Sequence, residues 1–367
     1  MQNKLDFLPF LKGLDSTSDD YSSLCPFVSP AWANFCIENT VPSEQYGVLS
    51  RDRKPFEVWL TVGPRSSRLR KNFQSIGLNE PSSTELASIT TEYNNLIGSE
   101  DFEALAEHMD EIFDALAQRH DWHELRLCAL NLSQKNSAIA SALRKGWLWH
   151  IHDERTTYST QLQLAGPGPI EQLFSSNTRQ QLRRNKRKLE LRHSDLTLET
   201  TRNCEIAQSW LDELAILHQL KWNSNGETSG FANPSFARFQ QSLLSTWLPQ
   251  GKLDLVKLSC SGRTVAILHF MTNSSTVFFN MSGINYLEFG DFKPGLLGHW
   301  IAMQHFKEKG VQTYDFMGGT NQYKQSLSTK SHEQFGLLIR RPSLRFLAEH
   351  HLRNFKRSRT SKKINAS

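Results

Sequence analysis

Residues 293–324 read KPGLLGHWIAMQHFKEKGVQTYDFMGGTNQYK, and the fold is decided by this stretch. Proline at the start and Gly310 at the end predict a helix over 294–310. The apolar run 311–317 that follows predicts a buried strand. Two glycines end this strand, and a Tyr-Lys pair comes four residues later. An ordinary strand exit needs neither the glycines nor an acid, Asp315, within the apolar run, so we expect a functional site here.

The elements before this strand point to an anion site. The segment 275–285 predicts another strand, so the order is strand, glycine-containing loop, helix, strand. A helix entered through glycine presents backbone N–H groups at its positive end, which suits phosphate. Gly295 would let a pyrophosphate approach the backbone closely. Pro-Gly before a helix is more often only a turn, so this signal needs support from the rest of the chain.

Length and composition indicate two domains in a reducing compartment. The chain has 367 residues, of which 38% are hydrophobic, enough for two cores of ordinary size. Its five cysteines are scattered and contain no Cys-x-x-Cys pair, which argues against a zinc site or a disulfide framework. The N-terminus lacks a signal-peptide pattern, and eighteen apolar residues never follow one another. We therefore expect a cytoplasmic protein that does not span a membrane.

The basic charge is concentrated at the C-terminus. Nine Lys/Arg against one acid give the segment from Arg340 onward a charge of +8, so the rest of the chain is net negative although the total is +5. A nucleic-acid footprint over the whole surface is not supported. The basic tail, 341–367, fits an acidic partner or a membrane surface, and a solvated terminus is the plainer interpretation.

Strands and helices alternate in both halves, which predicts an α/β layered fold. The first 45 residues suggest a loosely structured entry. In the first half we expect strands at 56–63 and 124–131, a helix over 100–120 with an apolar face, and a helix end at 140–146. In the second half we expect helices over 175–193 and 205–222 and a hairpin over 252–272. A Pro-Gly turn ends the strand at 157–169, so we expect domains at 1–165 and 166–340.

An ordered set of short motifs resembles a known family. The motifs are Arg183-Arg184-Asn185-Lys186-Arg187-Lys188-Leu189, Leu217-His218, Lys221-Trp222, the hairpin over 262–270, Pro294-Gly295-Leu296-Leu297, Tyr314-Asp315-Phe316, Gly318-Gly319 and Tyr323-Lys324. In order and spacing they resemble the CelD-like acetyltransferase domains of bacterial cellulose and exopolysaccharide biosynthesis, a branch of the GNAT superfamily. The likeness covers about 170–330, and Thr91-Glu92-Tyr93-Asn94-Asn95 matches less distinctly. It implies a mixed sheet flanked by helices, in two tandem GNAT-like halves as in Fem-type proteins.

The resemblance also implies a donor, acetyl-CoA or another acyl-CoA, and no metal. The donor would lie where the strands 277–284 and 311–317 splay apart, with its pyrophosphate on the helix that begins at Pro294. The binding residues would be Lys293, Gly295, Leu296, Leu297 and Gly298. The chain departs from the usual GNAT phosphate motif, because Phe292 stands at the Gln/Arg position and Leu297 at the second small position.

Catalytic roles follow from the same resemblance. It implies that Lys324 stabilises the oxyanion, that Asp315 positions the amine or acts as general base, and that Tyr323 donates a proton to the thiolate. Each residue also has a purely structural interpretation. Asp315 fits a turn cap or a partner of a buried arginine, Tyr323 fits the core, and Lys324 fits the surface.

Further residues are candidates for substrate or anion binding. Arg183, Arg184 and Arg187 crowd one face of the helix over 175–193, which suits the CoA 3′-phosphate, a nucleotide-sugar or a lipid-linked phosphate. A solvated helix face is the alternative. His218 is either an acceptor-site base or, more commonly for an apolar helix face, a core histidine with its hydrogen bonds satisfied. We expect Trp222 and Trp300 in the core.

The function that these observations favour is acyl-CoA-dependent transfer, N- or O-linked, of an acetyl group to a sugar or small amine in polysaccharide biosynthesis. Two other functions stay open. One is a Fem-like aminoacyltransferase that takes its donor from charged tRNA, the one case in which we expect a nucleic-acid partner. The other is a GNAT-like scaffold without catalytic activity.

Overall fold

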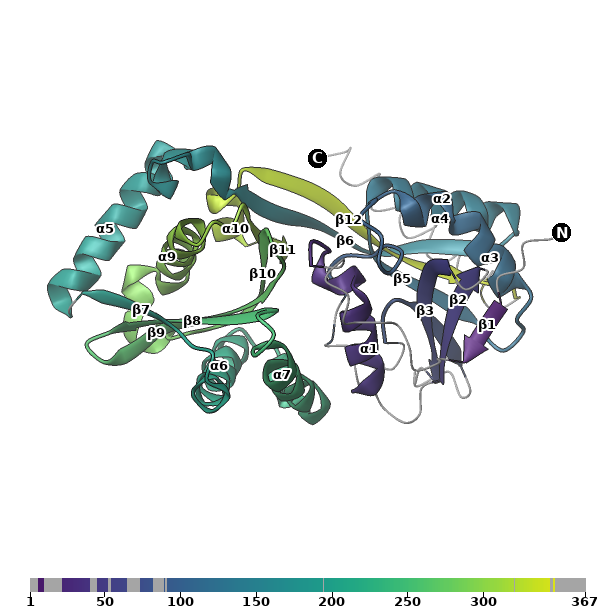
Figure 1. Cartoon of the computed structure of the whole chain (residues 1–367), viewed down its shortest axis with the longest axis horizontal. Helices are drawn as coiled ribbons and strands as arrows, with labels where there is room; N and C mark the ends of the chain where they lie inside the picture. The colour runs from purple at the N-terminus through teal and green to yellow at the C-terminus, as the bar shows by residue number, and fades with distance from the viewer. Residues whose placement is uncertain are drawn as a thin grey trace, which may run out of the picture. The chain divides into compact units, whose positions relative to one another are not determined.

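The chain folds into two compact units. The computed structural model describes residues 6–9, 22–39, 45–51, 54–64, 73–81, 89, 91–193, 195–319, 321–343 and 346. Unit 1 combines Met1–Ser16, Phe27–Glu154 and Gln334–Ser367, and unit 2 combines Thr17–Pro26 and Arg155–Glu333 (Figure 1). The chain passes between the units within β6 (Leu148–Gln161) and again within β12 (Lys330–Arg340). The predicted basic tail lies almost wholly outside the described residues.

Unit 1 is a mixed sheet with helices on it. The strand order is β1-β2-β3-β4-β5-β12. Strands β4 and β5 run parallel, whereas the pairs β1–β2, β2–β3, β3–β4 and β5–β12 are antiparallel. The bounds are Asp6–Pro9 for β1, Gln45–Arg51 for β2, Lys54–Pro64 for β3, Gln74–Leu78 for β4 and Glu124–Leu130 for β5. The strands predicted at 56–63 and 124–131 are confirmed. Helix α4 (Leu132–Arg144) ends as predicted, before Gly146 with its positive φ.

Two predictions for unit 1 are wrong. The helix expected over 100–120 is broken at His108 into α2 (Ala104–Glu107) and α3 (Met109–Ala117), because His108 leaves the helical conformation and its ring Nδ1 lies 2.8 Å from the Ala104 carbonyl. Phe102 precedes both helices and is 64% exposed. The entry segment also contains α1 (Pro30–Glu38), which Ser29 caps by accepting from the Trp32 N–H.

The asparagine-rich motif of the first half is buried and structural. Asn94 donates to the carbonyls of Leu78 and Cys128, and its side-chain oxygen accepts from Asn79 at 2.8 Å. Thr91 donates to the Asn79 carbonyl at 2.7 Å. These bonds satisfy backbone groups beside β4 and β5, which explains why polar residues occur there inside a core.

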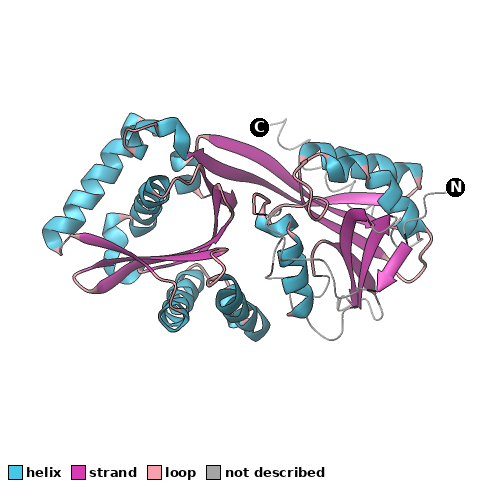
Figure 2. Cartoon of the chain, in the orientation of Figure 1, coloured by secondary structure: helices cyan, strands magenta, loops and turns pink. Residues whose placement is uncertain are grey.

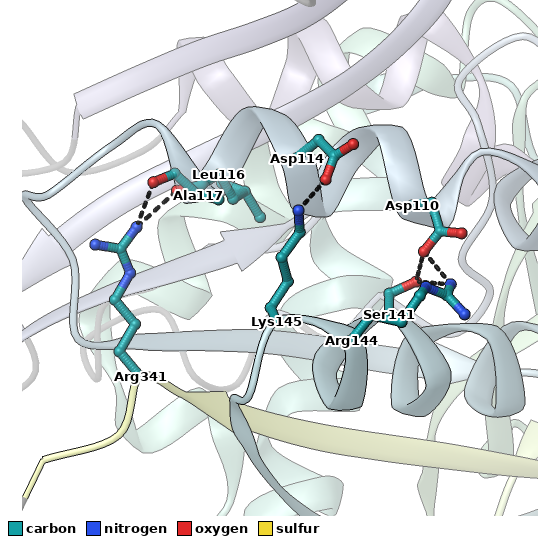
Figure 3. Close-up of polar contacts among 8 residues, drawn as sticks. All are labelled: Asp110, Asp114, Leu116, Ala117, Ser141, Arg144, Lys145 and Arg341. Atoms are coloured by element: carbon teal, nitrogen blue, oxygen red, sulfur yellow. Dashed lines mark hydrogen bonds and ion pairs between the residues drawn. The ribbon is translucent and has the colours of Figure 1, made fainter.

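Exposed ion pairs join α3 to α4 (Figure 3). Asp110 accepts from Ser141 and pairs with Arg144, and Lys145 pairs with Asp114. Arg341, just after β12, donates to the carbonyls of Leu116 and Ala117 at the end of α3. Because the α3–α4 pairs are solvent-exposed, each contributes only about 0–1 kcal/mol. The apolar core of the unit carries most of its stability.

The strands of unit 2 follow the order β6-β11-β10-β9-β8-β7. The bounds are Leu196–Thr200 for β7, Leu253–Cys260 for β8, Arg263–Thr272 for β9, Thr276–Ile284 for β10 and Thr313–Gly318 for β11. Only β10 and β11 are parallel among the pairs given for this sheet. The predicted hairpin is confirmed, and its turn residues Ser261 and Gly262 both have positive φ, as a tight hairpin requires.

Helices cover both faces of the sheet of unit 2 (Figures 1 and 2). On one side lie α6 (Cys204–Ser224) and α7 (Pro234–Trp247), and on the other α5 (Ser176–Arg192) and α9 (Pro294–Glu308). Unit 2 also contains two short helices, α8 (Tyr286–Phe289) and α10 (Gln322–Leu327). Its 3-10 turns are η3 (Leu162–Ala165), η4 (Ile170–Leu173), η5 (Gly230–Ala232) and η6 (Gly290–Phe292). The order of elements within both units confirms the predicted α/β class.

The apolar face of α6 departs from simple helical spacing at its start. Trp210 and Leu214 are buried, but Ile206 is 46% exposed and the stripe is completed by Ala207 and Leu211. Trp222 is 38% exposed and lies outside the core, so its predicted place in the core is wrong, whereas Trp300 is buried as expected.

Helix α6 lies against β10 at Gly283. A Cβ built on Gly283 would stand 2.6 Å from the Leu214 Cα and 2.7 Å from its carbonyl oxygen. Backbone cannot move aside as a side chain can, so we expect Gly283→Ala to lower the free energy of unfolding by roughly 1–3 kcal/mol or more.

Urea unfolding of the variant would measure this cost. Gly290→Ala is the matched control, because Gly290 has an ordinary helical φ and nothing within 4 Å of its built Cβ. Equal stability of the two variants would contradict the close approach of α6 to β10.

Candidate active site

The sheet of unit 2 opens where β10 and β11 stop pairing. Their shared register covers only Thr276–Thr313, Val277–Tyr314 and Phe278–Asp315, although both strands run on. The register of β10 against β9 shifts between Phe279 and Met281, and the register of β11 against β6 shifts between Asp315 and Met317. These irregularities follow directly on the last shared pair. In open α/β sheets the carboxyl ends of parallel strands are where ligands bind, so this opening is the candidate site.

A buried histidine lies beside this opening. His299, on α9, has its Nδ1 2.7 Å from the Tyr314 hydroxyl. Its ring stacks on Tyr323, with centroids 4.8 Å apart, and meets the Phe279 ring edge-on at 4.4 Å. One side chain thus joins α9, β10, β11 and α10. Sequence reasoning missed His299, since a single histidine in the apolar run GLLGHWIAM gives no distinctive signal.

Burial keeps this cluster uncharged. Burial and, after it, the nearby Lys324 charge lower the pKa of His299 to about 3, so the imidazole is neutral near pH 7. Burial also raises the pKa of both Tyr314 and Tyr323 above the usual range, so both stay protonated phenols. His299, Tyr314 and Tyr323 are therefore neutral near pH 7 and interact as hydrogen-bonding groups.

Lys324 is buried at the end of β11. It is 6% exposed, which excludes the surface interpretation, and its ammonium donates to the carbonyl of Phe316 at 2.8 Å and to that of Gly318. The two glycines make room for this arrangement. A Cβ on Gly319, whose φ is +134°, would stand 3.0 Å from Lys324 Nζ, and one on Gly318 would stand 2.8 Å from the Arg155 side chain.

The other predicted catalytic residues lie near the same strand end. Tyr323 precedes Lys324 on α10 and contacts His299. Asp315 is half-buried, and its carboxylate accepts from the Met317 N–H at 2.7 Å, beside the left-handed φ of Met317. This bond is a turn cap, one of the structural interpretations considered above. Because Tyr314 and Phe316 both contact His299, strand alternation places Asp315 on the opposite face.

At the start of α9, two backbone N–H groups have no partner within the helix. Lys293 is in the left-handed conformation, and no side chain caps the helix. Helix geometry leaves the N–H groups of Gly295 and Leu296 without intrahelical partners, whereas the Leu297 N–H already donates to Lys293 at 3.1 Å. The built Cβ of Gly298 meets Ala266 on β9 at 3.4 Å, so this glycine serves helix–sheet packing.

Two residues absent from the predicted site flank this helix start. A Cβ on Gly295 would stand 3.1 Å from the Tyr286 hydroxyl, so Tyr286 lies directly over the backbone there. The Lys221 ammonium donates to that hydroxyl at 3.4 Å and lies 4.8 Å from the ring centroid. An ammonium and a phenol beside a helix N-terminus make the local field attractive to an anion.

His218 lies elsewhere and has its hydrogen bonds satisfied. Its Nδ1 is 2.8 Å from the Ser229 hydroxyl, and its Nε2 accepts from the Trp222 indole N–H at 3.0 Å. Burial, and then the Lys221 charge, lower the pKa of His218 to about 4. These contacts support a structural role for His218. They do not place it beside Lys324.

The predicted arginines form a separate surface. Arg183, Arg184 and Arg187 are exposed along α5, on the outer side of a helix that packs on α9. They line an open hollow of about 590 Å³ whose lining residues all belong to α5. The structure therefore divides the predicted site into three groups, at the end of β11, at the start of α9 and along α5.

Two buried histidines, His269 and His299, and the half-buried His218 make stability depend on pH. Burial lowers the pKa of His218 and His269 to about 4 and that of His299 to about 3, against 6.5 for an unperturbed histidine. The unfolded chain thus takes up protons below pH ~6.5 while the folded chain resists them. We expect the free energy of unfolding to fall as the pH drops from ~6.5 towards ~4, by up to about 1.4 kcal/mol per pH unit for each histidine.

Urea unfolding at a series of pH values would measure this slope. His218→Gln should reduce it, and His332→Gln, at an exposed position, should leave it unchanged. Stability that stays constant between pH 7 and pH 5 would contradict the burial of these rings as neutral groups.

The described residues contain neither a group of metal-ligating side chains nor a membrane-spanning helix. Within the described ranges, no three His, Cys, Asp or Glu side chains come together as metal ligands would. Within the same part of the chain, no helix is long and apolar enough to cross a bilayer. The prediction that the reaction needs no metal stays a prediction.

Comparison with known proteins identifies the class of the second unit. Residues 176–325 match the family model described as an acetyltransferase (GNAT) domain. The match includes α5, the β10-α9-β11 crossover and α10, the elements that hold all three groups of candidate residues. The chain therefore carries a GNAT-type acyltransferase domain. No curated protein matches the sequence.

Solved structures agree with this class at the level of the fold. FemX is 12% identical, with a TM-score of 0.55 over 84% of this chain and 90% of its own. A conserved protein of unknown function from Bacteroides thetaiotaomicron is 13% identical, with a TM-score of 0.52 over 92% of this chain and 100% of its own. Both alignments cover most of the chain, and they confirm the predicted Fem-like α/β fold.

Proposed function

We propose that unit 2 transfers an acyl group, in the first place acetyl, from acyl-CoA to an amino or hydroxyl group of a sugar or small amine. One observation carries the proposal. A lysine ammonium is buried against two carbonyls at the strand end where β10 and β11 stop pairing, inside the part of the chain that matches the acetyltransferase model. A buried cation at that point stabilises negative charge that develops on an acyl oxygen.

The donor is proposed to bind at the start of α9. The N–H groups of Gly295 and Leu296 would hold the pyrophosphate of CoA, with Lys293 alongside. Lys221 and Tyr286 would support it from α6 and α8. Leu297 and Gly298, predicted from the resemblance, would contribute through packing, because the Leu297 N–H is already bonded and Gly298 faces β9.

The catalytic roles follow from position and protonation. Lys324 would stabilise the oxyanion. The resemblance assigns Asp315 to positioning the amine or accepting its proton, but Asp315 lies on the opposite face of β11 from Tyr323, so its role would be to hold the strand end through its bond to the Met317 N–H. Tyr323 would donate a hydrogen bond to the departing sulfur. Complete proton transfer from Tyr323 is unfavourable, since burial raises its pKa while a thiol has a pKa near 8.5. The thiolate would take its proton from the acceptor amine or from water. A sugar acceptor would fit the CelD-like resemblance to polysaccharide biosynthesis.

Calorimetric titration with acetyl-CoA tests the donor. Micromolar binding, followed by release of free thiol in the presence of amino sugars or small amines, is the expected result. Binding without transfer to any acceptor would leave the donor established and the acceptor class wrong. Absence of binding would overturn the proposal.

The second candidate is aminoacyl transfer from charged tRNA, which the basic surface of α5 favours. Similarity to FemX supports the fold of such an enzyme and nothing beyond it. Retention of charged tRNA that weakens steeply with salt, together with no acetyl-CoA binding, would support this candidate over the first.

A further inference from the structure

One face of α5 carries cations without acids. We call Gln180, Arg183, Arg184, Arg187, Lys188 and Leu191 the basic stripe, since their spacing of three and four residues places them on one side of the helix. All six are exposed. The single acid of α5, Glu190, is paired with Lys186, outside the stripe. The stripe spans about 16 Å of helix, and its four positive charges, from Arg183 to Lys188, face solvent within about 8 Å of it.

The stripe ends at an unusually exposed apolar residue. Leu191 is 76% exposed and Leu287, on α8, is 85% exposed, the two highest values among the described large hydrophobic side chains. The two elements are in contact. The His193 ring, at the end of α5, meets Phe289 at 5.2 Å and Phe292 at 5.6 Å, and Arg263 joins His193 to Glu288.

This combination fits a bilayer surface better than other anions. Cations attract any polyanion, but exposed leucines gain free energy only where they can leave water, as at the boundary of headgroups and acyl chains. Single-stranded nucleic acid binds aromatic platforms, and no stripe residue is aromatic. A single CoA phosphate would occupy one or two of the four cations.

We propose that α5 and α8 form a docking surface for anionic phospholipid bilayers. The basic stripe would lie against the headgroups, and Leu191 and Leu287 would enter the interface. The acetyl-transfer proposal does not depend on this docking, and its failure would not affect the docking.

Co-sedimentation of the full chain with vesicles tests the proposal. The vesicles would be phosphatidylcholine alone or phosphatidylcholine with about a third phosphatidylserine, at which surface potentials become appreciable. We expect the chain to bind the vesicles that contain phosphatidylserine and to bind vesicles of phosphatidylcholine alone only weakly. Each cation near such a surface changes partitioning about fivefold, so Arg183→Gln combined with Arg187→Gln should weaken it by roughly 25-fold.

Matched variants distinguish the contribution of the basic stripe to vesicle binding from that of the total charge of the protein. Arg238→Gln with Lys309→Gln removes two exposed cations elsewhere in unit 2 and should leave partitioning nearly unchanged. Leu191→Ser with Leu287→Ser should reduce the binding that persists at high salt, where charge attraction is screened.

Several outcomes would overturn the docking surface. One is absence of vesicle binding, and another is equal binding by the stripe variant and its control. A stripe variant that binds vesicles normally but loses acetyl-CoA or tRNA would assign the stripe to those ligands instead. Melting temperatures of all variants should match that of the parent, because the substituted side chains are exposed.

Discussion

Lys324→Met is expected to lower kcat for acyl transfer by about 10²–10³-fold, the usual cost of removing one donor to an oxyanion. Methionine keeps much of the length and apolar volume of the lysine stem but cannot stabilise negative charge. The Kd for acetyl-CoA should change little, because the proposed pyrophosphate site lies on α9 and not on α10. Thiol release under saturating donor and calorimetric titration would measure the two effects separately.

The fold must be checked in the same experiment. Lys324 donates to two carbonyls, so its removal leaves them unpaired, at a cost of roughly 1–3 kcal/mol in unfolding free energy. Activity should therefore be measured well below the melting temperature of the variant. Lys330→Met, at an exposed position on β12, is the control and should keep full activity. A fully active Lys324→Met variant would leave the lysine a structural residue and would assign stabilisation of the oxyanion to other groups.

Gly295→Asp is expected to cause the second large effect, a loss of affinity for acetyl-CoA. The carboxylate would stand at the N–H groups that we propose for the pyrophosphate, and its Cβ would come within 3.1 Å of the Tyr286 hydroxyl. We expect the Kd for acetyl-CoA to rise about 100-fold, which corresponds to ~2.7 kcal/mol. Titration of parent and variant with acetyl-CoA measures the difference.

Two further substitutions at the same position separate charge from size. Gly295→Asn has nearly the shape of the aspartate without its charge, and Gly295→Ala adds only the Cβ. A loss of affinity for acetyl-CoA that is largest for Gly295→Asp, smaller for Gly295→Asn and smallest for Gly295→Ala would locate the anion at this helix start. Equal losses for Asp and Asn would show that space alone decides binding, and unchanged binding by all three would place the donor elsewhere.

The parts of the fold that could be predicted rest on local signals. The β8–β9 hairpin follows from Ser261-Gly262, and the bounds of α9 follow from Pro294 and Gly310. The strand β11 follows from its apolar run. In each case neighbouring residues alone determine the backbone, so tertiary packing did not alter the result.

The missed features depend on contacts between distant residues. Helix α10 has six residues and no side-chain cap, too little to form without the strand that it packs on. His299 looks like any core residue until Tyr314 and Tyr323 are placed beside it. His108 interrupts a helix whose apolar spacing continues through it. The predicted catalytic trio shared one strand end, but only the structure could show that Asp315 lies on the other face.

The position of Lys324 has a consequence for how the chain matures. Its ammonium loses water when α10 settles on the end of β11, so the desolvation of this proposed catalytic group is completed during folding and not when substrate arrives. The charge then needs no reorientation as the reaction proceeds. Conversely, an incompletely folded chain, in which α10 is still loose, would hold a hydrated lysine and have little activity even with its donor bound.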